Sequence, residues 1–459
     1  MKVIILAGGG GTRLFPLSRE SRPKQFLNID SEESLLVQTI KRFRNVCKAS
    51  DIVIVTNEKY RYHVQNEIAL ARAKGAHILL EPIGRNTAPA IALAARFCLD
   101  ELGSSEDEVM FVSTSDHIIR PNKVFAATVE KAMPLSEEGK IVTFGIKPTR
   151  PDTGFGYIHA GEPYKQGYLV ESFKEKPDEE TAKDYLAQGG YYWNSGMFAF
   201  SIGCYLEELG QHAPDVAEYA RLPYAEMREK FESIPSISID YAVAEKSQRV
   251  MVLPLALYWN DVGSWDAIHE VLDKDEDGNA FRGDCLALDC SDTLMVGNSR
   301  LIAGVGLEGV VIVETPDVIL VARQGESQKV KDLVTELKKR GRKEAVEHTT
   351  LYYEWGSYTL LGEGVGYKMR KLVVNPGGRI PLHLHYHRSQ HWIVAAGTAR
   401  VRCGEEEKLL HDNEGQFLPL SVPHSVENPG RIPLEIIEVQ SGSYLEADDV
   451  EMIELQLCR

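Results

Sequence analysis

The first two dozen residues constrain the fold of this chain more than any other segment. Residues 3–7 are all apolar and are followed at once by Gly8, Gly9, Gly10 and Gly11. An apolar run of this length is typical of a buried parallel strand, and a glycine turn after it lets several backbone N–H groups approach one ligand. Arg13 and Lys24 add a planar and a mobile cation. This pattern predicts a polyphosphate site.

Two common glycine motifs do not fit this turn. A dinucleotide-binding fingerprint needs a third glycine where Arg13 stands. A Walker A loop needs a lysine beside the glycines, with Ser or Thr next, whereas Lys24 lies downstream and precedes Gln25. A purely structural turn would explain the glycines but neither cation, so we favour the phosphate site.

Length and composition exclude several classes of protein. A chain of 459 residues has room for two or three domains, and a 43% apolar share supplies their cores. The net charge of −16 argues against broad nucleic-acid binding, which needs a basic face. The seven cysteines include no C-x-x-C pair, which favours a reduced cytosolic protein. Since neither a signal peptide nor a membrane span is apparent, we expect a cytoplasmic protein without membrane partners.

The spacing of apolar runs predicts three domains. Residues 1–265 alternate strands with helices, which predicts a Rossmann-like α/β domain with a parallel or mixed sheet flanked by helices. Residues 266–345 form a β-rich connecting module that ends in a charged helix. Residues 346–459 break into short strands between turns, as in a β-barrel or sandwich.

Individual elements of these domains can also be placed. In the first domain we expect strands at residues 3–7, 51–56, 109–113 and 141–146, and a helix at 88–102. In the second we expect strands at residues 286–288, 310–314 and 318–322. The basic run from Lys338 to Lys343 is interpreted as a solvated helix end rather than a phosphate site.

Polar residues cluster where these strands should end, which is where α/β sheets bind ligands. Asp116 follows the strand at 109–113, and an acid facing phosphates is an expected Mg²⁺ ligand. Asp261 is a second acid that could converge on the same ion, although either aspartate alone could serve a turn. The segment from Glu81 to Ala90 is either a capped helix start, with Asn86 or Thr87 as the cap, or a loop that reads a base.

Three further segments, at residues 153–157, 173–177 and 193–198, would suit a sugar pocket. Glu175 can accept hydrogen bonds from hydroxyls, Lys176 can hold a sugar phosphate, and Asn194 can donate and accept. Taken singly, each segment is more simply an ordinary loop. Together with the glycine turn they indicate a phosphosugar substrate.

These motifs resemble the sugar-1-phosphate nucleotidyltransferases. The resemblance rests on the glycine turn, Glu175-Lys176-Pro177, Asn194-Ser195-Gly196 and Asp261-x-Gly263-Ser264-Trp265. Longer strings resemble the mannose-1-phosphate guanylyltransferases in their long bacterial form, namely Pro16-Leu17-Ser18-Arg19, Pro23-Lys24-Gln25-Phe26, residues 84–90 and Asp240-Tyr241-Ala242-Val243. The resemblance covers essentially the whole chain and departs at Thr114, where the family usually has proline.

The resemblance implies that mannose 1-phosphate attacks the α-phosphorus of GTP, so that pyrophosphate leaves and GDP-mannose forms. It implies catalytic roles for Arg13, Lys24, Asp116 and Asp261, the two aspartates holding Mg²⁺. The implied nucleotide-binding residues are Leu6, Ala7, Gly8, Gly9, Gly10, Gly11, Thr12, Arg13, Glu81, Gly84, Arg85, Asn86, Thr87 and Asp116. The implied sugar-binding residues are Gly156, Glu175, Lys176, Asn194 and Asp261. The partners are then GTP and mannose 1-phosphate, and a homodimer is an expected assembly that the sequence leaves open.

A second cluster of ligand-type side chains lies in the C-terminal domain. His383 and His385 share one face of a strand, and His424 on another strand could join them inside a barrel. This spacing resembles the cupin metal motif, with Gln390 where that motif has glutamate. The implied ligands are His383, His385, Gln390 and His424, around Zn, Co, Ni or Fe. A structural histidine cluster is the alternative.

The neutral Gln390 leaves the role of this domain open. In bifunctional relatives the corresponding barrel resembles a phosphomannose isomerase, which interconverts fructose 6-phosphate and mannose 6-phosphate and usually carries Glu at this position. Besides an enzyme with guanylyltransferase activity alone, two alternatives therefore stay open: a bifunctional enzyme that is also an isomerase, and a non-catalytic nucleotide-sugar sensor. A sensor is disfavoured because Arg13, Lys24, Asp116 and Asp261 are all present.

Overall fold

The computed structural model describes residues 1–9 and 11–453. Gly10, one of the predicted nucleotide-binding residues, therefore lies outside the described residues. The chain divides into two compact units, Met1–Ala345 and Val346–Arg459. Among the described residues, no helix combines the length and the apolar character that crossing a membrane requires.

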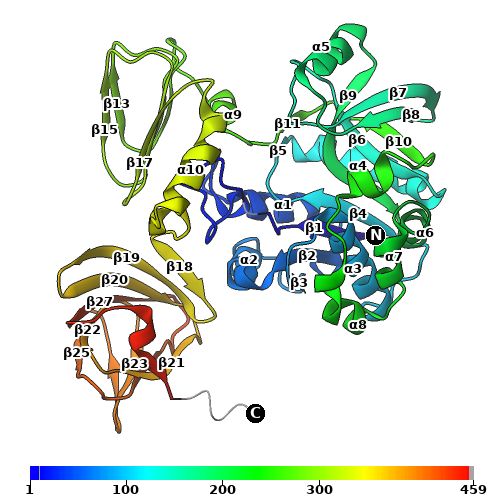
Figure 1. Ribbon diagram of the computed structural model, residues 1–459. Coiled ribbons are helices and arrows are strands. Elements are labelled where there is room, and N and C mark those ends of the chain that lie inside the picture. The colour runs from blue at the N-terminus through cyan, green and yellow to red at the C-terminus, as the bar shows by residue number, and fades with distance from the viewer. Residues whose placement is uncertain (10, 454–459) are drawn as a thin grey trace. The chain divides into compact units, whose positions relative to one another are not determined.

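One mixed sheet of nine strands, counted over the described residues, organises the first unit (Figure 1). Its strands are β1 (Lys2–Leu6), β2 (Ile52–Asn57), β3 (His77–Glu81), β4 (Val109–Thr114), β6 (Ile141–Ile146), β7 (Tyr157–Tyr164), β8 (Gly167–Lys174), β9 (Tyr191–Ser201) and β10 (Val250–Pro254). The order is β3-β2-β1-β4-β9-β6-β10-β8-β7. β1 is parallel to β2 and β4, whereas β9 is antiparallel to β4 and β6. The predicted mixed sheet is confirmed, and the four predicted strands are found within one residue of their expected bounds.

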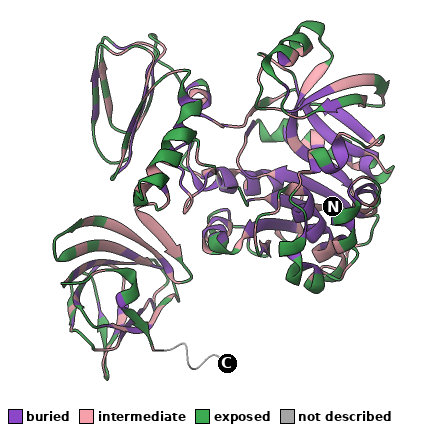
Figure 2. Ribbon diagram, in the orientation of Figure 1, coloured by how far each residue is buried: buried purple, intermediate pink, exposed green. Residues whose placement is uncertain are grey.

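Helices cover both faces of this sheet because its strands are apolar on both faces. Along β1, Ile4 packs into one core while Val3 and Ile5 pack into the other. The helices are α1 (Leu35–Phe43), α2 (Arg61–Leu70), α3 (Thr87–Asp100), α4 (Asn122–Glu137), α5 (Glu179–Gln188), α6 (Ile202–His212), α7 (Pro214–Ala220) and α8 (Tyr224–Glu229). α3, α6 and α7 supply the first core, and α1, α2 and α4 the second. Figure 2 shows the buried sheet as the purple centre of this unit.

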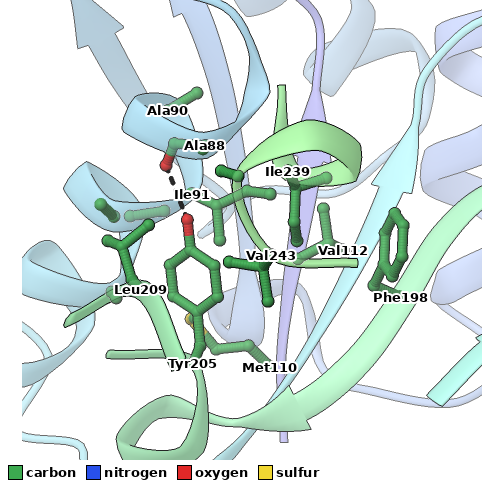
Figure 3. Packing of buried hydrophobic residues seen from close by; sticks show 14 of the residues in the cluster. Ala88, Ala90, Ile91, Met110, Val112, Phe198, Tyr205, Leu209, Ile239 and Val243 are labelled. Atoms are coloured by element: carbon green, nitrogen blue, oxygen red, sulfur yellow. Dashed lines mark hydrogen bonds between the residues drawn. The ribbon is translucent and has the colours of Figure 1, made fainter. Parts of the chain in front are cut away.

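The Ala-rich α3 is held against the sheet by close packing and by one buried hydrogen bond. The hydroxyl of Tyr205 on α6 donates to the carbonyl of Ala88 at 2.8 Å (Figure 3). Both residues are fully buried, and the carbonyl of Ala88 supplies the acceptor that the buried hydroxyl needs. This contact fixes the start of α3, where one of the candidate ligand-binding loops ends.

The first unit continues into a stack of short strands. The helix α9 (Trp265–Val271) precedes these strands and the helix α10 (Val330–Lys339) follows them. The strands are β12 (Ala280–Arg282), β13 (Cys285–Leu288), β14 (Leu294–Val296), β15 (Ile302–Val305), β16 (Val310–Glu314) and β17 (Ile319–Arg323). β12, β14 and β16 pair in parallel, and so do β13 and β15, as in successive coils of a β-helix. Arg19, on the N-terminal segment, forms a bidentate ion pair with Asp317 of this stack. Its two terminal guanidinium nitrogens lie 2.5 and 2.7 Å from the two carboxylate oxygens.

The second unit consists of two antiparallel sheets, over the part of the chain that is described. The strands are β18 (Thr350–Tyr353), β19 (Gly356–Gly364), β20 (Tyr367–Val374), β21 (Arg379–His385), β22 (Arg388–Ala396), β23 (Ala399–Cys403), β24 (Glu406–Leu410), β25 (Gly415–Leu418), β26 (His424–Glu427), β27 (Leu434–Gly442) and β28 (Val450–Met452). The sheets are ordered β18-β19-β20-β27-β22-β25 and β24-β23-β26-β21-β28. Both contribute to one apolar core, which agrees with a cupin-like domain, while closure into a barrel stays a prediction.

Candidate active site

The glycine turn after β1 borders a cavity of about 590 Å³ at the carboxyl edge of the sheet. None of the described glycines of this turn has a positive φ. A Cβ added to Gly8 would instead lie 3.2 Å from Oε2 of Glu81. Glycine at position 8 therefore permits the close approach of an acid to the backbone, and not a left-handed turn.

The predicted nucleotide-binding residues divide into those that line this cavity and those that do not. The cavity is lined by Leu6, Gly8, Gly9, Gly11, Glu81, Gly84, Asn86, Thr87 and Asp116, together with Lys24 and Gln25. Ala7 and Arg85 do not line it. The side chain of Ala7 is buried in the core because it continues the alternation of β1. The Arg85 guanidinium donates to the carbonyl of Glu232, which holds it away from the cavity.

Glu81 is the acid of this cavity that lies at the end of β3. One of its carboxylate oxygens, Oε1, is buried without a hydrogen-bond partner among the described residues. Burial raises the pKa of Glu81 to about 7. Asn86 caps α3 by accepting from the N–H of Thr87 at 2.8 Å, which confirms the predicted cap. A buried acceptor thus faces the cavity beside a fixed helix start.

Lys24 joins the two predicted metal-binding acids. Its Nζ lies 2.8 Å from Oδ2 of Asp116 and donates to the backbone carbonyl of Asp261. The acids meet because β5 (Ile118–Arg120) pairs with β11 (Tyr258–Asn260) in antiparallel register. Asp116 lies just before β5 and Asp261 just after β11, at the same end of the pair.

The charge of Asp116 is maintained by its neighbours. Burial works against the ionised carboxylate, but the Lys24 ammonium outweighs it, so the pKa of Asp116 lies below its ordinary value. The backbone N–H of Gly263 donates to Oδ1 of Asp261 at 3.3 Å, which orients the second carboxylate. The two carboxylates offer the hard oxygen ligands that Mg²⁺ prefers.

A second cavity, of about 320 Å³, continues beyond the glycine turn. It is lined by Gly11, Thr12, Arg13, Leu14, Lys24, Asp116, Asp261, Gly263 and Lys331. The predicted residues Thr12 and Arg13 therefore lie in this cavity and not in the larger one. Because Gly11, Lys24 and Asp116 line both cavities, one extended ligand could occupy them together.

A third cavity, of about 240 Å³, contains most of the predicted sugar-binding residues. Gly156, Glu175, Asn194 and Asp261 all line it. A Cβ on Gly156 would lie 2.3 Å from Oε2 of Glu175, so glycine lets this carboxylate enter the cavity. Lys176 does not line it, because its Nζ turns to Oε1 of Glu175 at 2.7 Å and forms an ion pair.

Asp240 is a residue of this cavity that the site prediction missed. It accepts from Nδ2 of Asn194 at 2.9 Å. Burial, followed by the nearby charge of Glu175, raises its pKa to about 6. It belongs to the string Asp240-Tyr241-Ala242-Val243, which was the signal in the sequence that could have identified it.

In the second unit, His383, His385 and His424 come together as predicted. One ring nitrogen from each lies within 4.8 Å of the others, and all three side chains are buried. Nδ1 of His383 lies 2.8 Å from the carbonyl of Pro381, and Nδ1 of His424 lies 2.9 Å from that of Val422. These contacts leave Nε2 of both rings as the free ligand atom.

Gln390 lies beside these histidines on β22. Its Nε2 is 3.0 Å from Nε2 of His385, while its Oε1 and Nε2 of His424 are buried without partners among the described residues. Burial lowers the pKa of His385 to about 4 and that of His424 to about 3. Burial lowers the pKa of His383 as well, so all three rings favour the neutral form that metal ligands need, and the unpartnered atoms suit a bound cation.

The first unit places a lysine between two acids at the carboxyl edge of a mixed sheet, an arrangement that suits an enzyme that transfers a nucleotidyl group. Residues 2–278 match the nucleotidyl transferase family. Residues 283–337 match a MannoseP isomerase/GMP-like beta-helix domain, and residues 340–455 match the C-terminal domain of mannose-6-phosphate isomerase.

Relatives narrow this class further. The chain is 48% identical to the xanthan biosynthesis protein XanB of Xanthomonas campestris, over 98% of this chain and 97% of that protein. It is 40% identical to the mannose-1-phosphate guanylyltransferase RfbM of Salmonella typhimurium, over 98% and 96%. A Thermus thermophilus structure described as a mannose-1-phosphate geranyltransferase is 32% identical, covers 73% of this chain and 99% of its own, and has a TM-score of 0.68. The chain belongs to the mannose-1-phosphate guanylyltransferase family.

Proposed function

We propose that this chain transfers GMP from GTP to α-D-mannose 1-phosphate and so forms GDP-mannose and pyrophosphate. The observation that carries the proposal is the position of Lys24. Its ammonium joins Asp116, which lines the nucleotide cavity, to Asp261, which lines the sugar cavity, and both acids line the phosphate cavity between them. A reaction between two phosphorylated substrates needs such a shared point.

The reaction is an in-line displacement that asks the protein for alignment and charge neutralisation. The phosphate of mannose 1-phosphate is already ionised at neutral pH, so no general base is needed. Lys24 would stabilise charge at the reacting phosphates, and Arg13 with the turn amides would hold the leaving phosphates. Asp116 and Asp261 would hold Mg²⁺, which when bound supplies further neutralisation of phosphate charge.

Glu81 supports guanine as the base. The Watson–Crick edge of guanine carries two adjacent donors, N1–H and the N2 amino group, whereas the same edge of adenine presents an acceptor at N1. A carboxylate accepts at both oxygens, and Oε1 of Glu81 is buried without a partner among the described residues. A guanine edge can donate to both carboxylate oxygens, whereas an adenine edge offers one donor, its N6 amino group, and places its N1 acceptor against the carboxylate.

We expect Glu81→Gln to raise the KM for GTP about tenfold to a hundredfold, because a bidentate base contact contributes about 1–3 kcal/mol. Steady-state kinetics at saturating mannose 1-phosphate would measure it. The wild-type KM should also rise about tenfold between pH 8 and pH 6. The carboxyl group titrates at a pKa of about 7, and its protonated form loses one acceptor.

GTP titrates in the same range, so Glu81→Gln is also the control for the pH series. In the variant, the change in KM that comes from the titration of GTP itself should persist, while the steep rise of KM below pH 7 that comes from Glu81 should disappear. Identical pH profiles for the two proteins would contradict the role given to Glu81.

The sugar cavity supports a hexose phosphate. Glu175, Asp240 and Asn194 supply acceptors and donors for hydroxyls within one cavity of about 240 Å³. We assign the catalytic domain to residues 1–265, the connecting module to 266–345 and the cupin-like domain to 346–459. Substrates of this kind are made inside cells, so we also infer a cytoplasmic protein.

The proposal is tested by incubating the purified chain with GTP, mannose 1-phosphate and Mg²⁺. We expect pyrophosphate and GDP-mannose in equal amounts. An absence of pyrophosphate would favour a nucleotide-sugar sensor that binds without turnover.

The three histidines favour a second candidate function, an isomerase in the second unit. His383, His385 and His424 would hold a divalent Zn, Co, Ni or Fe ion, with Gln390 beside them as a neutral fourth group. A coupled assay from fructose 6-phosphate with each of these metals would test the activity. If no mannose 6-phosphate forms with any of them, the isomerase proposal is removed.

We expect the protein to bind about one transition-metal ion per chain after EDTA treatment and reconstitution with Co²⁺ or Zn²⁺. His383→Ala and His424→Ala should each lose this ion, because removing one of three neutral ligands weakens binding steeply. Elemental analysis after desalting measures the metal content. His411→Ala, on an exposed loop, is the matched control and should retain the ion. Metal content that stays unchanged in all three variants would indicate a structural histidine cluster.

A further inference from the structure

One lining residue of the 320 Å³ cavity comes from the β-helix part of the chain. Lys331 lies in the first turn of α10, more than three hundred residues after Arg13, yet both line the same cavity. That cavity shares no lining residue with the loop from Glu81 to Thr87 where the base would bind. It is therefore the phosphate end of the nucleotide site.

The charges around this cavity leave two cations without an anion. Lys24 is paired with Asp116. Arg13 and Lys331, in contrast, form no ion pair with any residue that the structure describes. Exposed cations that converge on one cavity without a protein partner suit a ligand with several negative charges.

The other basic residues of α10 are already paired. Lys338 lies 3.1 Å from a carboxylate oxygen of Glu20, and Lys339 pairs with Glu336, as does Arg340 just after the helix. These contacts agree with a solvated helix end for the basic run that the sequence shows. Within the described part of α10, Lys331 is thus the one basic side chain without an ion pair.

Packing fixes the position of Lys331. Val330 and Val334, one turn apart, bury the inner face of α10 beside the exposed Lys331. Two turns after Lys331, Lys338 reaches Glu20 on the N-terminal segment. Just before α10, the N–H of Gly325 and the hydroxyl of Ser327 both donate to the carboxylate of Asp266. Figure 1 shows α10 beside the blue N-terminal segment and α9.

We propose that Lys331 binds the β- and γ-phosphates of the nucleotide and the pyrophosphate that leaves, so that the β-helix module completes the active site. The inference rests on the proposed guanylyltransferase function. The long, flexible stem of lysine suits a role as a mobile point charge beside the planar guanidinium of Arg13. The electrostatic stabilisation that Lys331 provides should grow as negative charge accumulates on the departing pyrophosphate.

The test is the reverse reaction, in which GDP-mannose and pyrophosphate form GTP and mannose 1-phosphate. We expect Lys331→Ala to raise the KM for pyrophosphate about tenfold or more, since a charge-assisted phosphate contact is lost. The KM for GDP-mannose should stay within twofold of wild type, and Lys331→Arg should restore most of the loss. Lys339→Ala, on the same helix and also exposed, is the matched control and should behave as wild type.

The outcomes separate this inference from the proposed function. A wild-type chain with no reverse or forward activity would overturn the guanylyltransferase proposal itself. An active wild type with an unchanged KM for pyrophosphate in Lys331→Ala and in Lys331→Gln would overturn only the role of Lys331. Equal rises in the KM for pyrophosphate and for GDP-mannose would also overturn it, because they would indicate a general distortion of the site.

Discussion

Replacing Lys24 by alanine is expected to lower kcat for GDP-mannose synthesis about a thousandfold, the scale of losing one preorganised charge at a reacting centre. Its ammonium lies 2.8 Å from Asp116, reaches the carbonyl of Asp261 and lines both the nucleotide and the phosphate cavities. Few other positions in the described site touch so many of its parts. Single-turnover kinetics at saturating GTP would measure the loss directly.

The fold should survive this change. Asp116 would lose its ion pair, but 30% of its side chain is exposed, so water can solvate the freed carboxylate. Unfolding curves of Lys24→Ala and wild type should therefore nearly coincide. Lys59→Ala, which removes an exposed lysine elsewhere on the same unit, is the matched control. A Lys24→Ala enzyme with a near-normal rate would show that this cation is not catalytic.

The second large effect is expected from the two acids. Asp116→Asn and Asp261→Asn should each lower kcat about a thousandfold and raise the Mg²⁺ concentration needed for half-maximal activity. Asparagine keeps the shape of the side chain and one oxygen but loses the charge that a hard cation requires.

The double variant makes this prediction sharper. If the acids act as one unit around one ion, Asp116→Asn/Asp261→Asn should be about as slow as either single variant, because residues that act together are strongly non-additive. Asp273→Asn, at an exposed position of the same unit, is the control for removing an acid. Losses that multiply in the double variant would mean that the two acids act independently.

Much of the α/β fold could be predicted because its signals are local. β1, β2, β4 and β6 are short runs of apolar residues buried on both faces, and such runs are recognisable without knowledge of their neighbours. The cap at Asn86 and the shared face of His383 and His385 follow from equally local rules.

The parts that escaped prediction depend on contacts between distant segments. The pairing of β5 with β11 brings Asp116 and Asp261 together, but each strand has only three residues and no periodicity to detect. Lys331 reaches the phosphate cavity only through the packing of α10 against the N-terminal segment. Neither arrangement leaves a signal within any short window of sequence.

Two predicted nucleotide-binding residues, Ala7 and Arg85, do not line the described cavities, and their roles stay predictions. Strand alternation buries the side chain of Ala7, and the guanidinium of Arg85 donates to the carbonyl of Glu232. The motifs indicate where the backbone runs, and the surrounding structure decides where these side chains point. Asp240 shows the converse, because tertiary folding adds it to a pocket whose other acids, Glu175 and Asp261, come from other segments of the chain.

The central claim is displacement at the α-phosphorus of GTP by mannose 1-phosphate, and label transfer tests it most directly. GTP carrying a radioactive phosphate at either the α or the γ position would be incubated with the purified chain, mannose 1-phosphate and Mg²⁺. We expect the α label to appear in GDP-mannose and the γ label in pyrophosphate, in equal amounts. A γ label in inorganic phosphate or in a sugar phosphate, with no α label in GDP-mannose, would contradict this account.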